Sequence, residues 1–340
     1  MDTLKKRNLF LAATLILVAV IVAVSAVILA RGPRDSSVEV LERNADGTLL
    51  VNDLNDGQMT IPGYDIAVND YNPTAFQASN GVMTYTEGTS LVGINVNYKN
   101  GEIDWAQVAE NGVDFAMIRV GYRGNEKGQI VLDSKFVENI TGATEAGIPV
   151  GVYFYSKAIS NEEAEEEATF VLEQIQTYQV TYPIAIFWEY DYNDDGTKDQ
   201  SSRTIQCNGE QITGFINAFC NKVKMAGRTP CYYAAKSFAY EDLDLSQLAN
   251  YDMWYAEYAS VPGFYYDFAM WQYTQEGSVP GISGSVPITL SLKQYGRHRR
   301  PASPGGGPYG FQARFPRPRK KEELWQSTVQ MNPTACGGWA

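Results

Sequence analysis

A glutamate at the end of an apolar stretch is the residue of this chain best placed for acid–base chemistry. The segment Tyr182–Trp188 is continuously apolar and is followed directly by Glu189. A continuous rather than alternating apolar run predicts a strand buried on both faces, as in a parallel sheet. Barrel enzymes carry their active sites at the carboxyl ends of such strands. Phe187 lies two residues before Glu189 and shares its face of the strand, so the neighbour on that face is a ring and not a second acid.

Composition restricts the chemistry that could accompany this glutamate. The 340 residues contain one histidine, His298, which lies in an Arg-rich segment outside any patterned region. Ser-His-Asp and Cys-His catalysis need a positioned imidazole, and zinc hydrolases usually need at least one. The formal net charge of −12 argues against nucleic acid as a partner. Hydrolysis by this chain would therefore depend on carboxylates, and no cofactor is expected.

The cysteines do not indicate a metal site. Cys207, Cys220, Cys231 and Cys336 show no C-x-x-C spacing. A disulfide among the first three is possible outside the cytoplasm, and buried free thiols are the alternative. The sequence leaves both open.

The first thirty residues predict a membrane anchor. Basic residues at positions 5–7 precede an uncharged apolar run over residues 9–30. Twenty-two helical residues span roughly 33 Å, enough to cross a bilayer, and the basic cluster favours a cytoplasmic N-terminus over residues 1–8. We expect a single-pass protein of the cell membrane with its C-terminal part extracellular. Secretion after cleavage of a signal peptide is the alternative, although such a peptide has a shorter apolar core of about 7–15 residues.

The rest of the chain divides into three segments. Residues 31–90 are rich in Asn, Asp, Gly and Thr, which predicts an extracellular stalk or linker with at most a little strand structure. Residues 91–292 alternate short apolar runs with helix-like segments, the pattern of a parallel sheet covered by helices. Residues 293–340 are rich in Arg, Pro and Gly and are expected to be disordered.

The middle segment predicts an α/β fold. Strands are expected over residues 91–97, 114–121, 148–156, 182–189, 229–235, 252–258, 268–274 and 285–290, and helices over 104–111, 134–146, 160–178 and 209–226. Ser160 and Glu163 have the spacing of a capping box at the start of the third helix. Eight strands in about 200 residues predict a compact β/α barrel whose later helices are short or missing.

Motifs along this segment resemble glycoside hydrolase family 25, the bacterial and phage lysozymes of the N-acetylmuramidase type. The matching segments are Gly93–Asn97, Gly101–Trp105, Phe115–Arg123, Asp133–Phe136 with Asn139, Ala146–Ser156, Trp254–Tyr258, Trp271–Thr274 and Gly281–Val286. The resemblance covers about residues 91–292. It implies an irregular, flattened TIM-like (β/α) barrel, and it implies action on the glycan strands of cell-wall peptidoglycan.

The acids of the family pattern are mostly substituted in this chain. The family has an Asp in the first strand, an Asp-x-Glu at the end of the central strand and an Asp near the last strand. Here Asn95, Phe187 and Pro287 stand at the three Asp positions, and only Glu189 remains. Retaining glycosidases need a proton donor and a second carboxylate, or a substrate group positioned by one. Asp-x-Glu places two such groups roughly 6–7 Å apart on one strand face.

Two functions follow from this pattern. The chain is a lysozyme-like peptidoglycan hydrolase with Glu189 as general acid, or it is a degenerate relative that binds peptidoglycan without cleaving it. Asp191 and Glu257 are the acids that could replace the missing carboxylate, although each is also explained as a solvated acid at the rim.

The aromatic residues and one acidic loop complete the candidates. Sugar rings stack on aromatic side chains near strand ends, which favours a saccharide cleft; the candidates are Tyr153, Tyr155, Tyr233, Tyr258 and Trp271. The loop after Glu189 has the first spacings of a calcium loop at Asp191, Asn193, Asp195 and Asp199. Position 12 of that loop would be Ser202 and not a bidentate Glu, so a turn-rich acidic loop without metal is the better interpretation.

Overall fold

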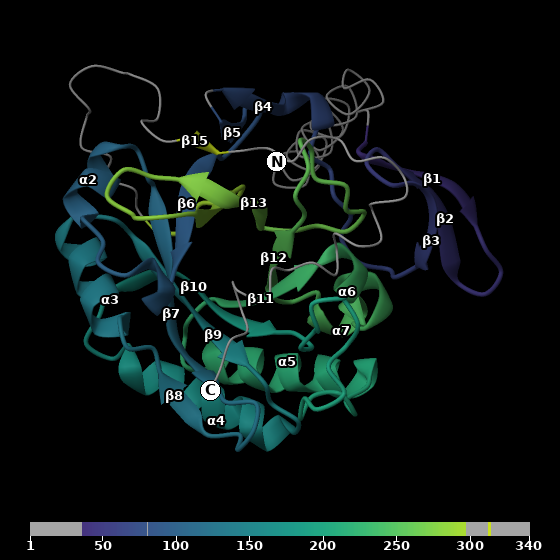
Figure 1. Cartoon of the computed structure of the whole chain (residues 1–340). Coiled ribbons are helices and arrows are strands. Elements are labelled where there is room, and N and C mark those ends of the chain that lie inside the picture. Colours follow the sequence, from purple (N-terminus) through teal and green to yellow (C-terminus); the bar gives the residue numbers. More distant parts are fainter. Residues whose placement is uncertain (1–35, 80, 297–311, 314–340) are drawn as a thin grey trace, which may run out of the picture. The chain divides into compact units, whose positions relative to one another are not determined.

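A closed barrel of eight strands forms the centre of the molecule (Figure 1). The computed structural model describes residues 36–79, 81–296 and 312–313, and from Ser37 these belong to one compact unit. Seven barrel strands are parallel, and the eighth is antiparallel to both of its neighbours and closes the ring. In order around the barrel the strands are β6 (Leu91–Val96), β7 (Phe115–Arg123), β9 (Val150–Ser156), β10 (Val180–Trp188), β11 (Pro230–Ala235), β12 (Asp252–Ala256), β13 (Met270–Ser278) and the antiparallel β14 (Val286–Ser291).

Helices connect the parallel strands; they lengthen from α2 to α5, and the last two, α6 and α7, are short. They are α2 (Trp105–Glu110), α3 (Phe136–Glu145), α4 (Asn161–Gln174), α5 (Gly209–Met225), α6 (Lys236–Glu241) and α7 (Leu245–Leu248). Figure 1 shows α3, α4 and α5 outside the barrel strands. Within the described residues no helix links β12 to β13 or β13 to β14, so the expected loss of the later helices is confirmed. A short strand, β8 (Ile130–Leu132), pairs with the end of β7.

Helix α4 begins with a cap that differs in one detail from the predicted capping box. The Ser160 hydroxyl accepts the backbone N–H of Glu163 at 3.2 Å. The Glu163 carboxylate accepts the N–H of Ile159, one residue before the cap, at 3.0 Å. Both side chains of the motif therefore accept a backbone N–H. In a capping box, however, Glu163 would accept the N–H of Ser160 and not that of Ile159.

Strand β10 is buried on both faces, as its continuous apolar sequence predicts. Its outward residues Ile184, Ile186 and Trp188 belong to the large apolar core that includes the helices. Ala185 and Phe187 face the barrel interior, where they pack in a second cluster with Tyr153, Tyr233 and Trp254. This interior has little spare room, because a Cβ added at Gly93 would lie 2.4 Å from the Phe115 ring. The barrel interior is therefore a packed core, and a binding site can form only at one end of the barrel.

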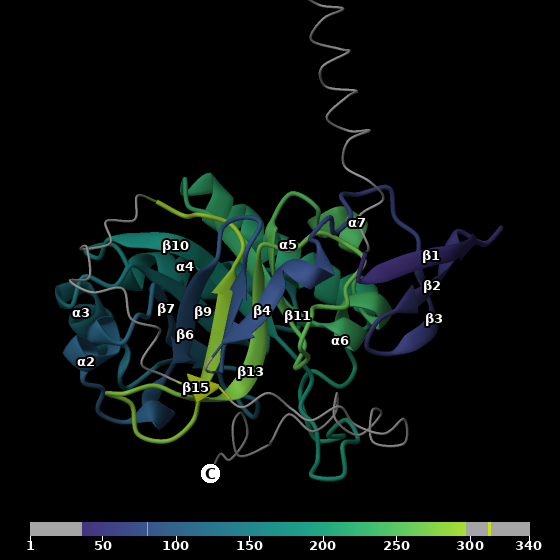
Figure 2. The ribbon, with the colours of Figure 1, turned by 90° about the horizontal axis from the view of Figure 1, so that it is seen from above.

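The segment predicted as a stalk contains more strand structure than expected. Strands β1 (Val38–Arg43), β2 (Thr48–Asp53) and β3 (Gly57–Pro62) form an antiparallel sheet, and β4 (Phe76–Ser79) and β5 (Val82–Tyr85) form a hairpin. Figure 2 shows β1–β3 beside α6, where Lys236 pairs with Asp53 at 3.0 Å. The Phe76 ring contacts Trp271 of β13 at a centroid distance of 5.5 Å. The expectation of little strand structure was wrong because these short strands depend on contacts with the barrel.

Order also continues past the predicted end of the barrel at residue 292. Tyr295 is buried, contacts the Tyr182 ring at 5.2 Å and donates to Asp252 at 2.8 Å. Strand β15 (Gln312–Ala313) pairs with β13. Residues 297–311 and 314–340 of the tail and the predicted anchor over residues 9–30 lie outside the described residues. No helix within the described part of the chain is both long and apolar enough to cross a membrane.

Candidate functional site

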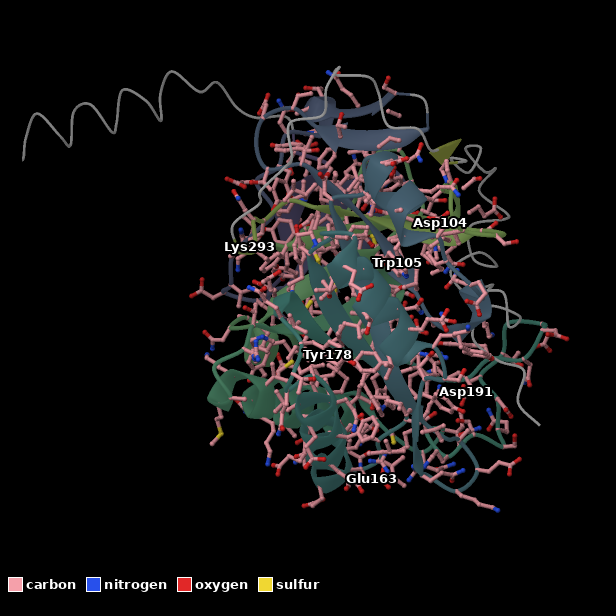
Figure 3. The ribbon with its side chains drawn as sticks, turned by 90° about the vertical axis from the view of Figure 1, so that its left-hand side faces the viewer. Asp104, Trp105, Glu163, Tyr178, Asp191 and Lys293 are labelled. Atoms are coloured by element: carbon pink, nitrogen blue, oxygen red, sulfur yellow. The ribbon has the colours of Figure 1, made fainter. Side chains whose placement is uncertain are left out.

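The carboxyl ends of the parallel strands form one end of the barrel, which we call the mouth. Asp191 follows β10 at this end, whereas Lys293 follows the antiparallel β14 at the other end; Figure 3 shows the two residues on opposite sides of the barrel. Glu189 follows the last residue of β10 and so lies at the mouth. The mouth therefore holds the residue that the sequence identifies as the candidate acid.

Phe187 lies beneath Glu189 and is fixed by aromatic neighbours. Its backbone pairs with Tyr155 of β9 and with Tyr233 of β11. The Phe187 ring stacks on Tyr233 with a centroid distance of 3.8 Å and an interplanar angle of 14°. The ring centroids of Tyr155 and Tyr153 lie 5.5 and 6.2 Å from the centroid of the Phe187 ring. The position that would carry a second carboxylate is thus part of an apolar layer.

The Glu189 carboxylate is buried and has no direct counter-ion among the described residues. The residue is 9% exposed. Burial raises the pKa of Glu189 to about 8; Lys157 lowers the pKa and Asp191 raises it further. At neutral pH the side chain therefore holds its proton, as a general acid must.

Lys157 lies next to Glu189 but does not pair with its carboxylate. The ammonium donates to the main-chain carbonyl of Glu189 at 2.7 Å and pairs with the Asp191 carboxylate at 2.7 Å. The other Asp191 oxygen accepts from the Ser202 hydroxyl at 2.6 Å. Asp191 is one of the two acids that could replace the missing carboxylate, and both of its carboxylate oxygens already have partners.

Glu257, the other replacement candidate, belongs to a separate ion cluster. Its carboxylate lies 2.6 Å from the Lys236 ammonium. It also accepts from the Tyr255 hydroxyl at 2.9 Å and from the Gly263 N–H at 2.6 Å. Asp53 and Asp56 contact the same lysine at 3.0 and 2.6 Å. Glu257 thus ties the N-terminal sheet to the barrel and has no spare oxygen facing Glu189.

A network of neutral polar groups occupies the far side of the mouth. The Asn95 amide donates to Gln272 at 2.7 Å and accepts from the Thr289 hydroxyl at 3.1 Å. Gln272 in turn donates to the Tyr258 hydroxyl at 3.0 Å. The pairing of β14 with β6 sets Ile288 opposite Ile94, and continuing this register places Pro287 opposite Asn95. Two of the three substituted positions are therefore neighbours, and neither carries a charge.

Four of the five predicted aromatic residues lie around this mouth. Tyr153, Tyr155 and Tyr233 surround Phe187, and Tyr258 reaches the network through Gln272. Trp271 does not join them. It is fully buried on the outer face of β13, and its indole N–H donates to the Glu257 carbonyl at 2.9 Å.

The acidic loop after Glu189 satisfies its own polar groups. Asp195 accepts from the backbone and hydroxyl of Thr197, and Asp199 accepts from the backbone and hydroxyl of Ser201. Asn193 donates to the Thr197 hydroxyl, and Asp191 pairs with Lys157. These hydrogen bonds within turns match the interpretation of an acidic loop better than a set of metal ligands pointing at one centre.

Three polar residues of the site were missed in the sequence: Lys157, Gln272 and Thr289. Gln272 and Thr289 lie on strands whose two faces are both buried, so no alternation marks the inward residues. Lys157 follows a strand directly, and lysines are usually exposed. Its position next to two strand ends was the available signal. The described cysteines Cys207, Cys220 and Cys231 are free thiols, which resolves the alternative left open by the sequence.

Comparison with known proteins agrees with this architecture. The chain is 26% identical over 199 residues to the autolytic lysozyme of Clostridium acetobutylicum, covering 58% of this chain and 55% of that protein. It is 24% identical over 205 residues to lysozyme M1 of Streptomyces globisporus, covering 58% of this chain and 66% of that protein. The chain thus spans about half to two thirds of the length of these relatives.

Solved structures show the same fold. The modular autolysin LytC from Streptococcus pneumoniae matches with a TM-score of 0.53 and 25% identity, over 73% of this chain and 57% of that chain. A family 25 glycosyl hydrolase from Bacillus anthracis matches with a TM-score of 0.50 and 18% identity, over 64% of this chain and 96% of that chain. The model of glycosyl hydrolases family 25 matches residues 94–282, more than half of the sequence. The chain therefore belongs to glycosyl hydrolase family 25.

Proposed function

We propose that the barrel mouth binds the glycan strands of bacterial peptidoglycan and does not cleave them at the rate of a lysozyme. The observation that carries this proposal is the Phe187 ring, stacked at 3.8 Å on Tyr233 where a second carboxylate would have to stand. The acids that could take over, Asp191 and Glu257, are held in ion pairs with Lys157 and Lys236.

The physical reason is the charge of the transition state. Glycosidic cleavage passes through an oxocarbenium-like state, which a neighbouring carboxylate stabilises. An aromatic layer and a neutral amide network carry no negative charge, so they stabilise positive charge on the sugar ring much less than a carboxylate does. We expect the loss of this stabilising carboxylate to lower the rate by an amount comparable to the ~10²–10⁴ that general acid–base assistance supplies. The same surroundings suit binding, because sugar faces stack on aromatic rings and sugar hydroxyls bond to amides and tyrosines.

Hydrolysis with Glu189 as the general acid is the second candidate. It is favoured by the pKa of Glu189, which burial raises to about 8, so that the side chain is protonated at neutral pH. In that case the substrate itself would have to supply the group that stabilises the transition state.

Purified peptidoglycan and the full chain separate the two functions. Sedimentation with the insoluble wall measures binding, and release of new reducing ends measures cleavage. The proposal expects sedimentation without reducing ends for the wild-type chain. Release of muramidase products that disappears in Glu189→Gln would establish the hydrolase instead, and failure to sediment would remove the binding function.

The placement of the protein is also a proposal. The curated relatives are lysozymes, including an autolytic lysozyme of a bacterium. We propose that the barrel faces outward at the cell surface, held there by the apolar run over residues 9–30. Fractionation of cells into membrane and secreted fractions tests the anchor against signal-peptide cleavage.

A further inference from the structure

Lys157 is a buried cation at the centre of the mouth to which the family pattern used above gives no role. It follows β9 directly and is 2% exposed. Its ammonium contacts the Glu189 carbonyl, the Asp191 carboxylate and, at 5.0 Å, the face of the Tyr155 ring. A buried ammonium must find such partners, because an unpaired charge in the interior is strongly destabilising.

The choice of partners is the informative feature. The carbonyl that Lys157 contacts belongs to Glu189 itself. In the described ion pairs, however, Lys157 pairs with the Asp191 carboxylate and not with the Glu189 carboxylate. The lysine therefore fixes the backbone from which the Glu189 side chain extends. It also holds Asp191 by one oxygen, while Ser202 holds the other at 2.6 Å.

We infer that Lys157 is the positioning residue of the mouth: it aims the Glu189 side chain at the bound glycan and keeps Asp191 away from it. This inference rests on the proposed glycan-binding function of the same site. Direct pairing of Lys157 with Glu189 would instead ionise the glutamate and remove its proton from the site. The titratable groups with a Coulombic interaction with Glu189 are Lys157, Asp191, Tyr192 and Tyr258.

Opposite substitutions in the full chain test the inference. In protein labelled with ¹³C at glutamate carboxyls, Glu189 is assigned by the signal lost in Glu189→Gln, and its titration midpoint is followed by NMR. Lys157→Met removes the cation that favours ionisation and should raise the midpoint by about one unit or more. Asp191→Asn removes the nearby negative charge and frees the lysine, so it should lower the midpoint.

Binding to purified peptidoglycan gives the second readout. Lys157→Met should weaken sedimentation about tenfold, and Lys157→Arg should restore most of it because it keeps a cation at the same place. Lys135→Met is the matched control, because Lys135 pairs with Glu102 and Glu138 on the exposed start of α3. It should change neither readout.

Two outcomes would overturn the inference. One is a Glu189 midpoint that stays unchanged in Asp191→Asn and, where Lys157→Met folds, in that variant too. The other is a loss of binding in Lys157→Met no larger than in Lys135→Met. If the wild-type chain itself does not bind the wall, the proposed function fails, but the titration still decides whether Lys157 positions Glu189. Because loss of a buried lysine can unfold a chain, Asp191→Asn keeps the test decisive when Lys157→Met does not fold.

Discussion

Two glutamates in this barrel follow strand ends, and each lies beside a buried lysine, yet their surroundings differ. Lys236 contacts the Glu257 carboxylate directly at 2.6 Å, together with Asp53 and Asp56. Lys157 contacts only the main chain of Glu189 and pairs with Asp191. Burial alone would lower the pKa of Lys236, but the three carboxylates outweigh it and raise that pKa. The comparison separates a glutamate whose carboxylate is held in an ion cluster from one whose carboxylate is buried without such a partner among the described residues, so that burial raises its pKa.

The ion cluster around Lys236 can be disrupted by removing its cation. Lys236→Met would leave three carboxylates around an apolar side chain, with Asp53 and Glu257 largely buried. Removing one partner of a buried ion pair costs about 3–5 kcal/mol, so we expect the free energy of unfolding to fall by that amount. Urea unfolding measures it. Lys135→Met, which removes an exposed pair, serves as control and should have little effect; an equally small effect of Lys236→Met would mean that the cluster does not hold the N-terminal sheet to the barrel.

Neutralising Glu189 should change how stability depends on pH. The folded pKa of Glu189 is about 8, above its ordinary value of 4.5, so the folded state binds the proton more tightly. Stability from this group is therefore full below pH 4.5 and is lost as pH rises toward 8. Glu189→Gln should match the wild type near pH 4 and exceed its stability well above pH 8 by about 5 kcal/mol, because each pKa unit corresponds to about 1.4 kcal/mol.

Glu257→Gln provides the contrast for that measurement. Since Glu257 is paired with Lys236, neutralising it should destabilise the fold at neutral pH. Thermal or urea unfolding at several pH values gives both comparisons. Stabilisation by Glu257→Gln, or destabilisation by Glu189→Gln at pH 9, would contradict the roles assigned to the two residues.

The two faces of the strands offer a smaller test. Tyr155 lies on the inner face, 5.5 Å from the Phe187 ring, whereas Trp271 is buried on the outer face of β13. Tyr155→Ala should weaken wall binding about threefold to tenfold, because an aromatic contact contributes about 0.5–1.5 kcal/mol. Trp271→Phe keeps an aromatic ring outside the mouth and should leave binding unchanged. Equal losses in the two variants would place the glycan elsewhere.

The barrel was predictable from the sequence, because each apolar run has strand length and is bounded by turn residues. The predicted strand over residues 91–97 corresponds to β6, and that over residues 229–235 to β11. Glu189 and Phe187 were predictable as neighbours because one strand fixes their spacing. The inward or outward direction of Trp271 was not, because strands buried on both faces show no alternation.

The remaining features depend on contacts between distant segments. The Lys236 cluster joins residues about 180–200 positions apart, and no local pattern announces such a pairing. Strands β1–β5 have polar, turn-rich sequences, and the barrel surface supplies the apolar contacts that they need. Lys157 was overlooked because its sequence position suggests a solvated end of a strand, whereas two neighbouring strand ends enclose it.

We propose that the carboxylate missing at position 187 separates binding from cleavage, and Phe187→Asp in the full chain restores that carboxylate. The measurement is release of reducing ends from purified peptidoglycan by the wild type, Phe187→Asp and the matched control Phe187→Asn, which removes the ring without adding charge. We expect binding without measurable cleavage by the wild type and by Phe187→Asn, and cleavage increased by about 10²–10⁴ in Phe187→Asp. Wild-type cleavage at the level of Phe187→Asp would contradict this proposal.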